Sequence, residues 1–479
     1  MSVRPSVQLI AALLIVGAVL YFVLPVVLNE DRESLHDINR WLQKTKDTPP
    51  EELIALLEHS DPAWRRRAIE GLAIVGPKTD AVVPALIFRL EDSEASVRKA
   101  AASSLASMAD AAVPQAVDPL LNRRNDPDPE VRVAVYFALS KMVAREPVRL
   151  RDPLIDGLKY GTEAIRYHAA AGLGELTEDD QALAALVDAL DRSSADGAIA
   201  RAIHAHGPRA IDYLELALDE PDRRLGAIQA LRSFGSEAAR LGQRIVEYLE
   251  PTSAAQMQRA IADAVTETGG LERETALPRL LPLLGSELTS VQMSGAKAIA
   301  SLGDEVVPGL RRILEQRGPR LPGALRCLAV LAPPDVEIAR LVVEILRDPA
   351  TEPRARVLAA RALGKMGADL DATLGALSML LGRSTEPNLL NAAAMACADL
   401  GPPAIGALPM LVGALKETES RAAKQSLLHA ITEISRPVDG VVHPMARNLV
   451  VPVMRELRDK EAFEAQRPSI DRLIEELSK

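Results

Sequence analysis

The chain has 479 residues, a formal net charge of −10 at pH 7 and only 3% aromatic residues. The acidic balance argues against a nucleic-acid partner, because binding to a phosphate backbone needs a basic surface. The two cysteines, Cys327 and Cys397, lie two copies of the repeat described below apart, on interior helix positions, so we interpret them as small core residues that are not joined by a disulfide.

The first predicted element is an uncharged run of 22 residues, 7–28, that follows a short head, 1–6. As a helix it would be about 33 Å long, enough to cross a hydrocarbon core of about 30 Å. We therefore interpret 7–28 as a single transmembrane anchor. A cleaved signal peptide is the alternative, but the run is long for one, and no small-x-small cleavage motif precedes Asn29.

The orientation of this anchor depends on its flanks. Arg4 precedes the run, and Arg32 and Arg40 follow it among acidic residues, so the charge count by itself leaves the orientation open. A short head before such a run usually stays inside the cell. We therefore expect a single-pass membrane protein whose remaining chain is extracytoplasmic, in a periplasm or on the outer face.

Residues 29–50 form the predicted juxtamembrane linker. Leu35, Ile38, Trp41 and Leu42 fall at helical spacing, which indicates a short amphipathic helix. This helix would either rest on the membrane interface or cap the first repeat. The prolines at 49–50 favour its end there.

From residue 51 the chain is dominated by a repeat, first seen as WRRRAIEGLAIVG at 64–76. Its copies stand 28 to 35 residues apart, most often 34, and the position of Ala68 recurs at Ala101, Val135, Ala169, Ile199, Ala227, Ile261, Gly295, Ala324, Ala359, Ala393 and Leu427. Self-similarity at this period is typical of a solenoid.

Each copy is predicted to be a pair of helices, A and then B, where B is the thirteen-residue signature. Prolines are expected in the first turn of helix A at Pro84, Pro119, Pro153, Pro278, Pro308 and Pro409. Glycines are expected to end helix B at Gly76, Gly207, Gly235, Gly269, Gly303, Gly367 and Gly401. Sustained strand patterns are absent from the sequence.

The faces of helix B predict its surroundings. Trp64, Leu72 and Val75 lie within about 40° of Ala68 on a helical wheel, which makes this the face toward helix A. The rows on both flanks, through Arg67 and Ile69, are small or apolar in most copies. We therefore predict an all-α, right-handed α-solenoid of about twelve helix pairs over 51–435, behind the transmembrane helix.

The end of the chain, 436–479, departs from the repeat. Two further helices are expected, at 441–459 and 468–478, and the last one is polar. A solenoid end would otherwise expose its core, so we interpret this region as capping helices.

The repeat pattern, D-P-x-x-V-R-x-x-A-x-x-L-x-x-h-G followed by V-x-P-x-L, resembles HEAT repeats, specifically the HEAT-like type of phycobilisome lyases. Residues 61–65 and 128–132 match it best. The resemblance implies a ladder of Asp and Arg side chains along the turns, with the arginines at Arg65, Arg98, Arg132, Arg166, Arg224 and Arg356.

The sequence offers no convincing catalytic, cofactor or metal site. It contains no G-x-S-x-G, Walker A or G-x-G-x-x-G motif. His204 and His206 point apart on a helix and are interpreted as surface residues, while His168 and His429 stand singly. We predict a protein that is not an enzyme. An enzyme or cofactor chaperone of the bilin-lyase-like HEAT class is the alternative that the resemblance leaves open.

One feature suggests binding. The rows of helix B that point away from helix A hold eight cations, against only Glu70 and Asp263: Arg66, Lys99, Arg201, Arg232, Arg259, Lys297, Arg326 and Arg361. Solenoids bind extended partners on this concave surface. We therefore predict a membrane-anchored scaffold whose basic groove binds a protein, with an acidic or extended segment as the expected contact. A solvated face with chance charge is the alternative.

Overall fold

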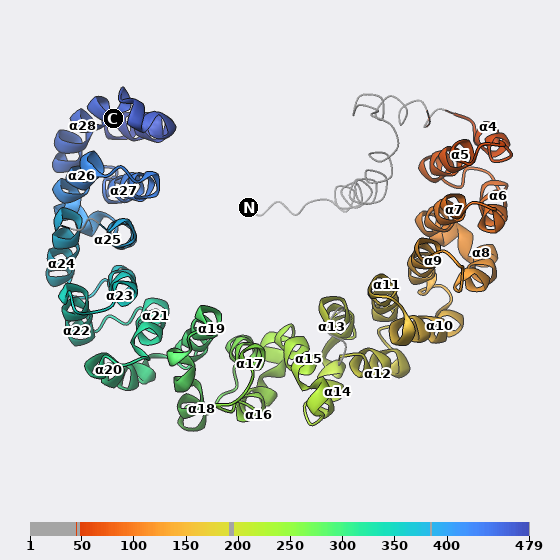
Figure 1. Ribbon diagram of the computed structural model, residues 1–479, viewed down its shortest axis with the longest axis horizontal. Coiled ribbons are helices and arrows are strands. Elements are labelled where there is room, and N and C mark those ends of the chain that lie inside the picture. Colours follow the sequence, from red (N-terminus) through yellow and green to blue (C-terminus); the bar gives the residue numbers. More distant parts are fainter. Residues whose placement is uncertain (1–44, 46–47, 191–195, 384–385, 479) are drawn as a thin grey trace. The chain divides into compact units, whose positions relative to one another are not determined.

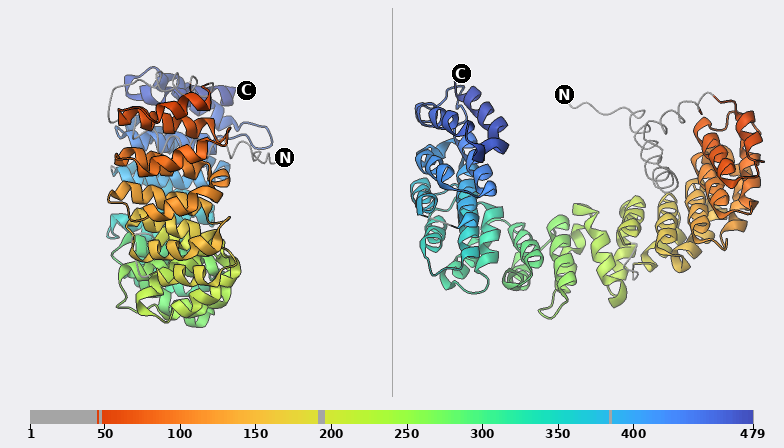
Figure 2. Two further views of the ribbon diagram at one scale, coloured as in Figure 1. Left: turned by 90° about the vertical axis from the view of Figure 1, so that its right-hand side faces the viewer. Right: turned by 45° about the horizontal axis from the view of Figure 1, so that its top comes forward.

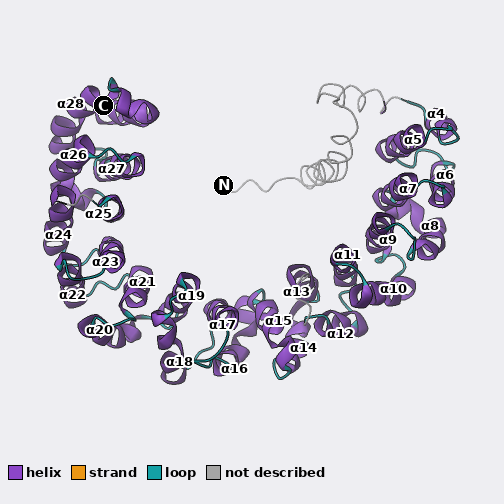
Figure 3. Ribbon diagram, in the orientation of Figure 1, coloured by secondary structure: helices purple, strands orange, loops and turns teal. Residues whose placement is uncertain are grey.

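The computed structural model describes residues 45, 48–190, 196–383 and 386–478. Over these ranges the chain is helical, apart from one isolated bridge between Val438 and Val441 (Figure 3). The chain divides between Tyr213 and Leu214 into two compact units, each of which is described by itself.

The first unit alternates between two layers of helices, which we call A and B after the predicted pairs; the left view of Figure 2 shows its helices stacked on one another. The A layer contains α4 (Pro50–Leu56), α6 (Val82–Phe88), α8 (Ala109–Arg123), α10 (Pro147–Tyr160) and α12 (Asp180–Asp188). The B layer contains α5 (Pro62–Val75), α7 (Ala95–Ser107), α9 (Pro129–Met142), α11 (Glu163–Gly174) and α13 (Asp196–Ala205).

The second unit continues the same alternation, with its odd-numbered helices in one layer and its even-numbered helices in the other (Figure 1). The B layer contains α15 (Pro221–Arg232), α17 (Ala255–Thr268), α19 (Thr289–Ala300), α21 (Leu321–Leu331), α23 (Pro353–Met366), α25 (Pro387–Leu400) and α27 (Arg421–Ile434). The A layer contains α16 (Gly242–Glu247), α18 (Arg273–Leu280), α20 (Val307–Gln316), α22 (Val336–Arg347), α24 (Leu370–Arg383) and α26 (Leu408–Glu417), while α14 (Ala210–Ala217) contains the division between the units.

The chain ends outside the repeat. One turn of π-helix, Ala446–Val450, leads into α28 (Val451–Arg458), and a short 3-10 segment leads into α29 (Arg467–Ser478). Met454, Ile470 and Leu477 of these helices are buried. Helical backbone begins at residue 444, so the first of the two expected helices starts three residues after its predicted start at 441.

The predicted repeat is confirmed: the described residues contain twelve A/B pairs. The aligned small residue is fully buried in most copies, as at Ala101, Ala169 and Ala359, and the large residue four positions later, such as Leu139 or Leu173 in its copy, is buried as well. Within a unit neighbouring B helices pack on one another, and the B helices other than α15 also pack on their A partners. The small residues allow this close approach, and the larger ones fill the space between the layers.

The predicted helix ends are confirmed in part: a glycine directly follows α5, α17, α23 and α25, whereas α13, α15 and α19 end two or three residues before theirs. All seven glycines adopt a positive φ, between 53° and 84°. This left-handed backbone is strained for other residues, so glycine lets helix B stop and the chain turn toward the next pair. A different requirement applies at Gly157, where an added Cβ would lie 2.3 Å from the ring of Tyr136.

The proline prediction is wrong for three of the six positions. Pro84, Pro308 and Pro409 lie in the first turn of their A helices. In contrast, Pro119, Pro153 and Pro278 lie inside α8, α10 and α18. These three helices begin earlier than the pattern indicated and accept the loss of one backbone hydrogen bond at a partly or fully exposed site.

The predicted position of Trp64 is also wrong, because its side chain is 47% exposed. The same place in the next two copies holds Val97 and Val131, which are fully buried. The larger indole instead lies beside the ring of His59, at 5.8 Å between centroids.

None of the helices in the described ranges is long and apolar enough to cross a membrane. The predicted anchor, 7–28, and the helix expected around Leu35 to Leu42 lie outside the described residues.

We expect Leu139→Ala to lower the free energy of unfolding by roughly 2–5 kcal/mol, because it leaves a cavity at a fully buried position of α9. Chemical denaturation of the purified protein measures the change. Val148→Ala, at a side chain 78% exposed on α10, is the control and should change stability by less than about 0.5 kcal/mol. Equal stability of the two variants would contradict the helix register.

Candidate interaction surface

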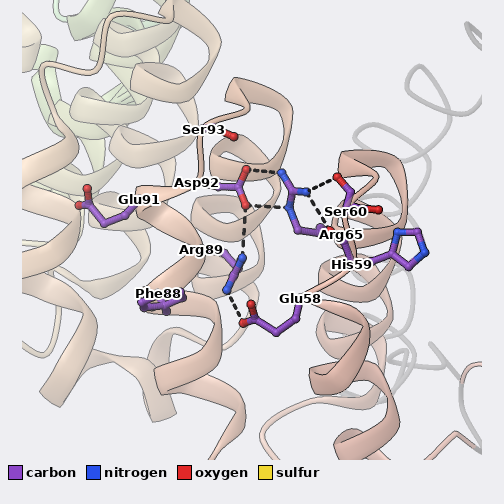
Figure 4. Close-up of a pocket in the computed structure, with 9 residues that line it drawn as sticks. All are labelled: Glu58, His59, Ser60, Arg65, Phe88, Arg89, Glu91, Asp92 and Ser93. Atoms are coloured by element: carbon purple, nitrogen blue, oxygen red, sulfur yellow. Dashed lines mark hydrogen bonds and ion pairs between the residues drawn. The ribbon is translucent and has the colours of Figure 1, made fainter.

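The turns of the first repeats are tied together by two buried ion pairs. Arg65 donates to both carboxylate oxygens of Asp92, at 2.9 and 2.7 Å, and to the carbonyl oxygens of His59 and Ser60 (Figure 4). Arg98 repeats this geometry with Asp126, at 2.9 and 2.8 Å. The side chain of Asp126 is fully buried. These pairs confirm the start of the Asp/Arg ladder that the resemblance implies.

The rest of the ladder departs from the expectation. The hydrogen bonds found for Arg132, Arg166, Arg224 and Arg356 go to backbone carbonyl oxygens. The carboxylate acceptor stands nine positions before the aligned small residue of the next copy. That place holds Asp92 and Asp126 in the second and third copies, but Tyr160 and Leu190 in the fourth and fifth. The prediction failed because it considered only where the arginines recur, and not whether a carboxylate stands at the acceptor position of the next copy.

An open pocket of about 430 Å³ lies beside the ion pair of Arg65 and Asp92, and Figure 4 shows the side chains that line it. Its two arginines are already paired: Arg65 with Asp92, and Arg89 with Glu58 at 2.5 Å and with Asp92 at 3.5 Å. Because its charges are internally matched, we assign no ligand to this pocket.

The histidines and cysteines give no sign of a reactive centre. His206 is buried, its Nε2 lies 3.1 Å from the Leu173 carbonyl oxygen, and burial lowers its pKa. Its predicted surface position is therefore wrong, because α13 ends before it. Burial lowers the pKa of His168 to about 4 and raises the pKa of the Cys327 and Cys397 thiols to about 12. Among the described residues, no three His, Cys, Asp or Glu residues are grouped to hold a metal.

The structure separates the eight predicted cations into two classes. Three are neutralised by acids of their own layer: Arg66 lies 3.7 Å from Glu70, Lys99 lies 2.7 Å from Glu130, and Arg232 lies 3.7 Å from Asp263. For the other five, no ion pair is found in the part of the chain that the structure describes: Arg201, Arg259, Lys297, Arg326 and Arg361. Arg201 belongs to the first unit, and the other four belong to the second.

Three of these five cations, Lys297, Arg326 and Arg361, lie on three consecutive B helices of the second unit. The helices α19, α21 and α23 pack side by side (Figure 1). None of them contains an Asp or Glu, although the whole chain is acidic. Four of their exposed or half-buried cations form what we call the basic patch: Lys297, Arg326, Arg354 and Arg361. The other two cations of α23 are left out of it, because Arg356 donates to the Leu346 carbonyl oxygen and Lys365 is paired with Asp399 at 2.7 Å. Sequence analysis missed Arg354, and the acid-free helices were the signal that could have found it.

Two arginines of the basic patch are held by neutral groups. Arg326 donates through Nε to Oε1 of Gln292 at 2.9 Å, and Arg354 donates through Nη2 to Oγ1 of Thr289 at 2.7 Å. Gln292 is buried and is itself anchored, since its Nε2 donates to the Leu284 carbonyl oxygen at 3.0 Å. Neutral acceptors position a guanidinium without cancelling its charge.

The pKa of Arg326 is affected by its burial and by the arginines near it. Burial, followed by the positive charges of Arg354 and Arg361, lowers the pKa of its guanidinium, which nevertheless stays protonated. An anion placed among these groups would relieve the repulsion and gain charge-assisted hydrogen bonds. The arrangement is therefore suited to binding negatively charged side chains.

Comparisons with known proteins agree with this architecture. A family model described as HEAT repeats matches residues 50–140 and 117–207. Residues 50–207 are therefore similar to HEAT repeats. A search of curated proteins finds no match to this chain.

Solved karyopherin structures share the fold. Kap121p bound to Ste12p superposes with a TM-score of 0.61 at 14% identity, covering 98% of this chain and 57% of Kap121p. Kap121p bound to Nup53p gives 0.58 at 14% identity, covering 98% of this chain and 57% of the other. The chain thus spans little more than half the length of these proteins. At this identity the likeness shows a shared helical solenoid fold and nothing finer.

We expect Asp126→Asn to destabilise the protein by roughly 3–5 kcal/mol, as is usual when one partner of a buried pair is lost. Burial alone would raise the pKa of Asp126, but hydrogen bonds from Arg98 and the Asp128 backbone, with the charge of Arg98, bring it below its usual value. Its stabilising contribution is therefore present above about pH 4 and is lost as the pH falls through the folded-state pKa.

Denaturation between pH 2 and pH 7 checks this prediction. The wild type should lose stability in acid more steeply than Asp126→Asn. Asp110→Asn, at a carboxyl group 84% exposed, is the matched control and should follow the wild type. A pH slope in Asp126→Asn equal to that of the wild type would contradict the assigned role of the pair.

Proposed function

We propose that this protein is a scaffold that binds protein partners through the B-layer surface of its second unit and carries out no chemistry itself. The observation that supports this most is the basic patch: unneutralised cations on three neighbouring helices that contain no acid, in a chain of net charge −10. A local reversal of charge on an open surface favours capture of an oppositely charged partner.

The proposed partner presents an acidic, extended segment. Lys297, Arg326 and Arg361 occupy equivalent positions of successive repeats, so they form a row that runs across the helices. Structures of Kap121p with Nup53p and with the extreme C-terminus of the phosphatase Cdc14p show that a related fold binds other proteins. We assign Arg259 to the margin of this surface and leave Arg66, Lys99 and Arg232 out of it, because acids neutralise them.

Cofactor handling in the manner of bilin lyases is the second candidate. It rests on the repeat pattern at 61–65 and 128–132 alone. The two candidates differ in a simple observation: a lyase or cofactor chaperone would become coloured when co-expressed with a tetrapyrrole supply, whereas a scaffold would stay colourless and retain protein partners after mild cross-linking.

We further propose that residues 7–28 tether the scaffold to a membrane and place the repeats on its extracytoplasmic side. This proposal rests on the length and apolarity of the run and on the short head before it. A tether would confine the basic patch near the membrane and raise the effective concentration of membrane-bound partners.

We expect the combined variant Lys297→Glu, Arg326→Gln and Arg361→Glu to lose its partners in a cross-linking pull-down from native membranes. Glutamine is chosen at Arg326 because that side chain is half-buried against Gln292. Capture by the wild type should weaken as salt rises, since exposed charges are screened over about 8–10 Å at physiological ionic strength.

A matched control changes cations of the A layer instead: Arg312→Glu, Arg340→Gln and Lys416→Glu, on α20, α22 and α26. This control should keep the partners, and both variants should keep wild-type circular dichroism. Full capture by the patch variant, in low and high salt alike, would refute binding through this surface.

We expect the full chain to stay in the membrane fraction after an alkaline wash, and a variant lacking residues 1–28 to be released, because 7–28 is the proposed anchor. Protease added to cells whose outer barrier has been opened should degrade the repeats. Protection until the cells are lysed would instead place the repeats in the cytoplasm.

A further inference from the structure

Two arginines of the basic patch are held at one place on α19. Arg326 of α21 donates through Nε to Oε1 of Gln292 at 2.9 Å. Arg354 of α23 donates through Nη2 to Oγ1 of Thr289 at 2.7 Å. Thr289 and Gln292 stand three residues apart on α19, and side chains at this spacing are neighbours on one helix face, about 5–6 Å apart at Cβ. The two guanidinium groups are therefore brought together, although they come from different repeats.

A third arginine acts on this pair. Arg361 follows Arg354 by seven residues, so both lie on the same face of α23, about two turns apart. Burial, and after it the positive charges of Arg354 and Arg361, lower the pKa of the Arg326 guanidinium. Both charges are thus close enough to Arg326 to repel it. We call these three side chains the arginine cluster: Arg326, Arg354 and Arg361.

In the part of the chain that the structure describes, no carboxylate forms an ion pair with any member of the arginine cluster. The helices that carry it, α21 and α23, and the helix that holds it, α19, contain no Asp or Glu. Glu287 and Glu352 precede α19 and α23, and both are exposed. Because the cluster has like charges and no counter-charge, an anion bound among them would be attracted by all three arginines.

The arginine cluster keeps hydrogen-bond donors for such an anion. A guanidinium group has five N–H donors in a planar fork, and each of the two hydrogen bonds to α19 uses only one of them. The Thr289 hydroxyl accepts from Arg354 and still has its own proton to donate. Arg354 and Arg361 are exposed and Arg326 is half-buried, so a ligand can approach from solvent. Guanidinium forks of this kind bind phosphate oxygens in pairs.

The concentration of charge favours a phosphoryl group over a carboxylate. A carboxylate carries one negative charge and offsets one arginine. A phosphomonoester carries about −1.5 to −2 charges at pH 7 on three acceptor oxygens, so one compact group can accept from two guanidinium groups at once. Two separate carboxylates at the same place would repel each other, whereas the charges of a phosphoryl group are already joined by covalent bonds.

Resting on the proposed function, we propose that the arginine cluster is a phosphoryl-binding site for a phosphorylated side chain of the protein partner. Arg326 and Arg354 hold the phosphoryl group between them, and Arg361 adds positive charge from further along α23. Thr289 is a positioning residue, because its hydroxyl fixes Arg354. Acidic residues beside the phosphorylated one meet the remaining cation of the basic patch, Lys297. This site does not depend on the side of a membrane on which the repeats lie.

Four fluorescently labelled peptides test this inference with the full chain. They share a neutral glycine–alanine host and differ at the centre, which holds serine, phosphoserine, one glutamate or two adjacent glutamates. The last peptide has the charge of a phosphoryl group divided between two carboxylates. Fluorescence polarisation at low and physiological salt gives each dissociation constant. We expect the phosphoserine peptide to bind at least about tenfold more tightly than the other three, the difference of one good charge contact.

The pH dependence of binding provides a second readout. The second pKa of phosphoserine is about 6, so the phosphoryl group loses negative charge as the pH falls from 7 to 5. Glutamate has an ordinary pKa of about 4.3 and stays mostly ionised over this range. We therefore expect the phosphoserine peptide to lose at least about threefold in affinity between pH 7 and pH 5, while the diglutamate peptide changes less.

Substitutions in the arginine cluster connect this preference to the site. Arg326→Gln and Arg354→Gln should each remove most of the preference for phosphoserine over glutamate. Arg354→Lys keeps the charge but loses the planar fork, so it should keep only part of the preference. Arg312→Gln, at an exposed arginine of α20, is the control and should keep all of it. Circular dichroism equal to that of the wild type shows that each variant is folded.

The inference is overturned if the serine or diglutamate peptide binds as tightly as the phosphoserine peptide, or if none of the four binds. Tighter binding to vesicles that contain phosphatidic acid than to the phosphoserine peptide would also overturn it, since the phosphomonoester would then belong to a lipid. The pull-down decides the proposed function separately. Partners retained by the wild type and lost by the patch variant would keep the scaffold, even where the peptides reject the phosphoryl site.

Discussion

Close packing of each B helix against its neighbours is the constraint on which the rest of this structure depends. The aligned position holds a small residue in most copies, as at Ala101, Ala169 and Ala359, and these are fully buried. A B helix with an A partner on one side and B helices beside it keeps one face for solvent. Any binding through this layer therefore uses side chains on that one face of each helix, repeated along the unit.

The same position in the repeat serves stability in one unit and leaves charge available in the other. Arg65 and Arg98 are neutralised by buried carboxylates, which tie successive turns together. In α19 the equivalent residue is Gln292, whose amide holds Arg326 without cancelling its charge. A neutral glutamine in place of the paired arginine thus retains a hydrogen-bonded link between repeats, and it leaves the cation that it holds without a neutralising carboxylate.

Much of the fold could be predicted from the sequence, because the relevant interactions are local or repeat at a fixed spacing. The period near Ala68 predicted twelve helix pairs, and glycines such as Gly76 predicted the ends of helix B. The prolines inside α8, α10 and α18 could not be assigned correctly, because these helices extend upstream of a proline that the pattern placed in the first turn, and a proline by itself does not fix where a helix begins.

For the candidate site, the sequence by itself determined which helix face carries the cations, because helical periodicity fixes direction. Only the tertiary structure decided which of them keep their charge. Lys99 is neutralised by Glu130 of the next B helix, whereas Arg326 meets the neutral Gln292. It also brought Arg354 onto the patch, through a bond to Thr289, 65 residues away in the sequence. Neutralisation depends on distances between side chains of different repeats, and a single helical pattern contains no information about them.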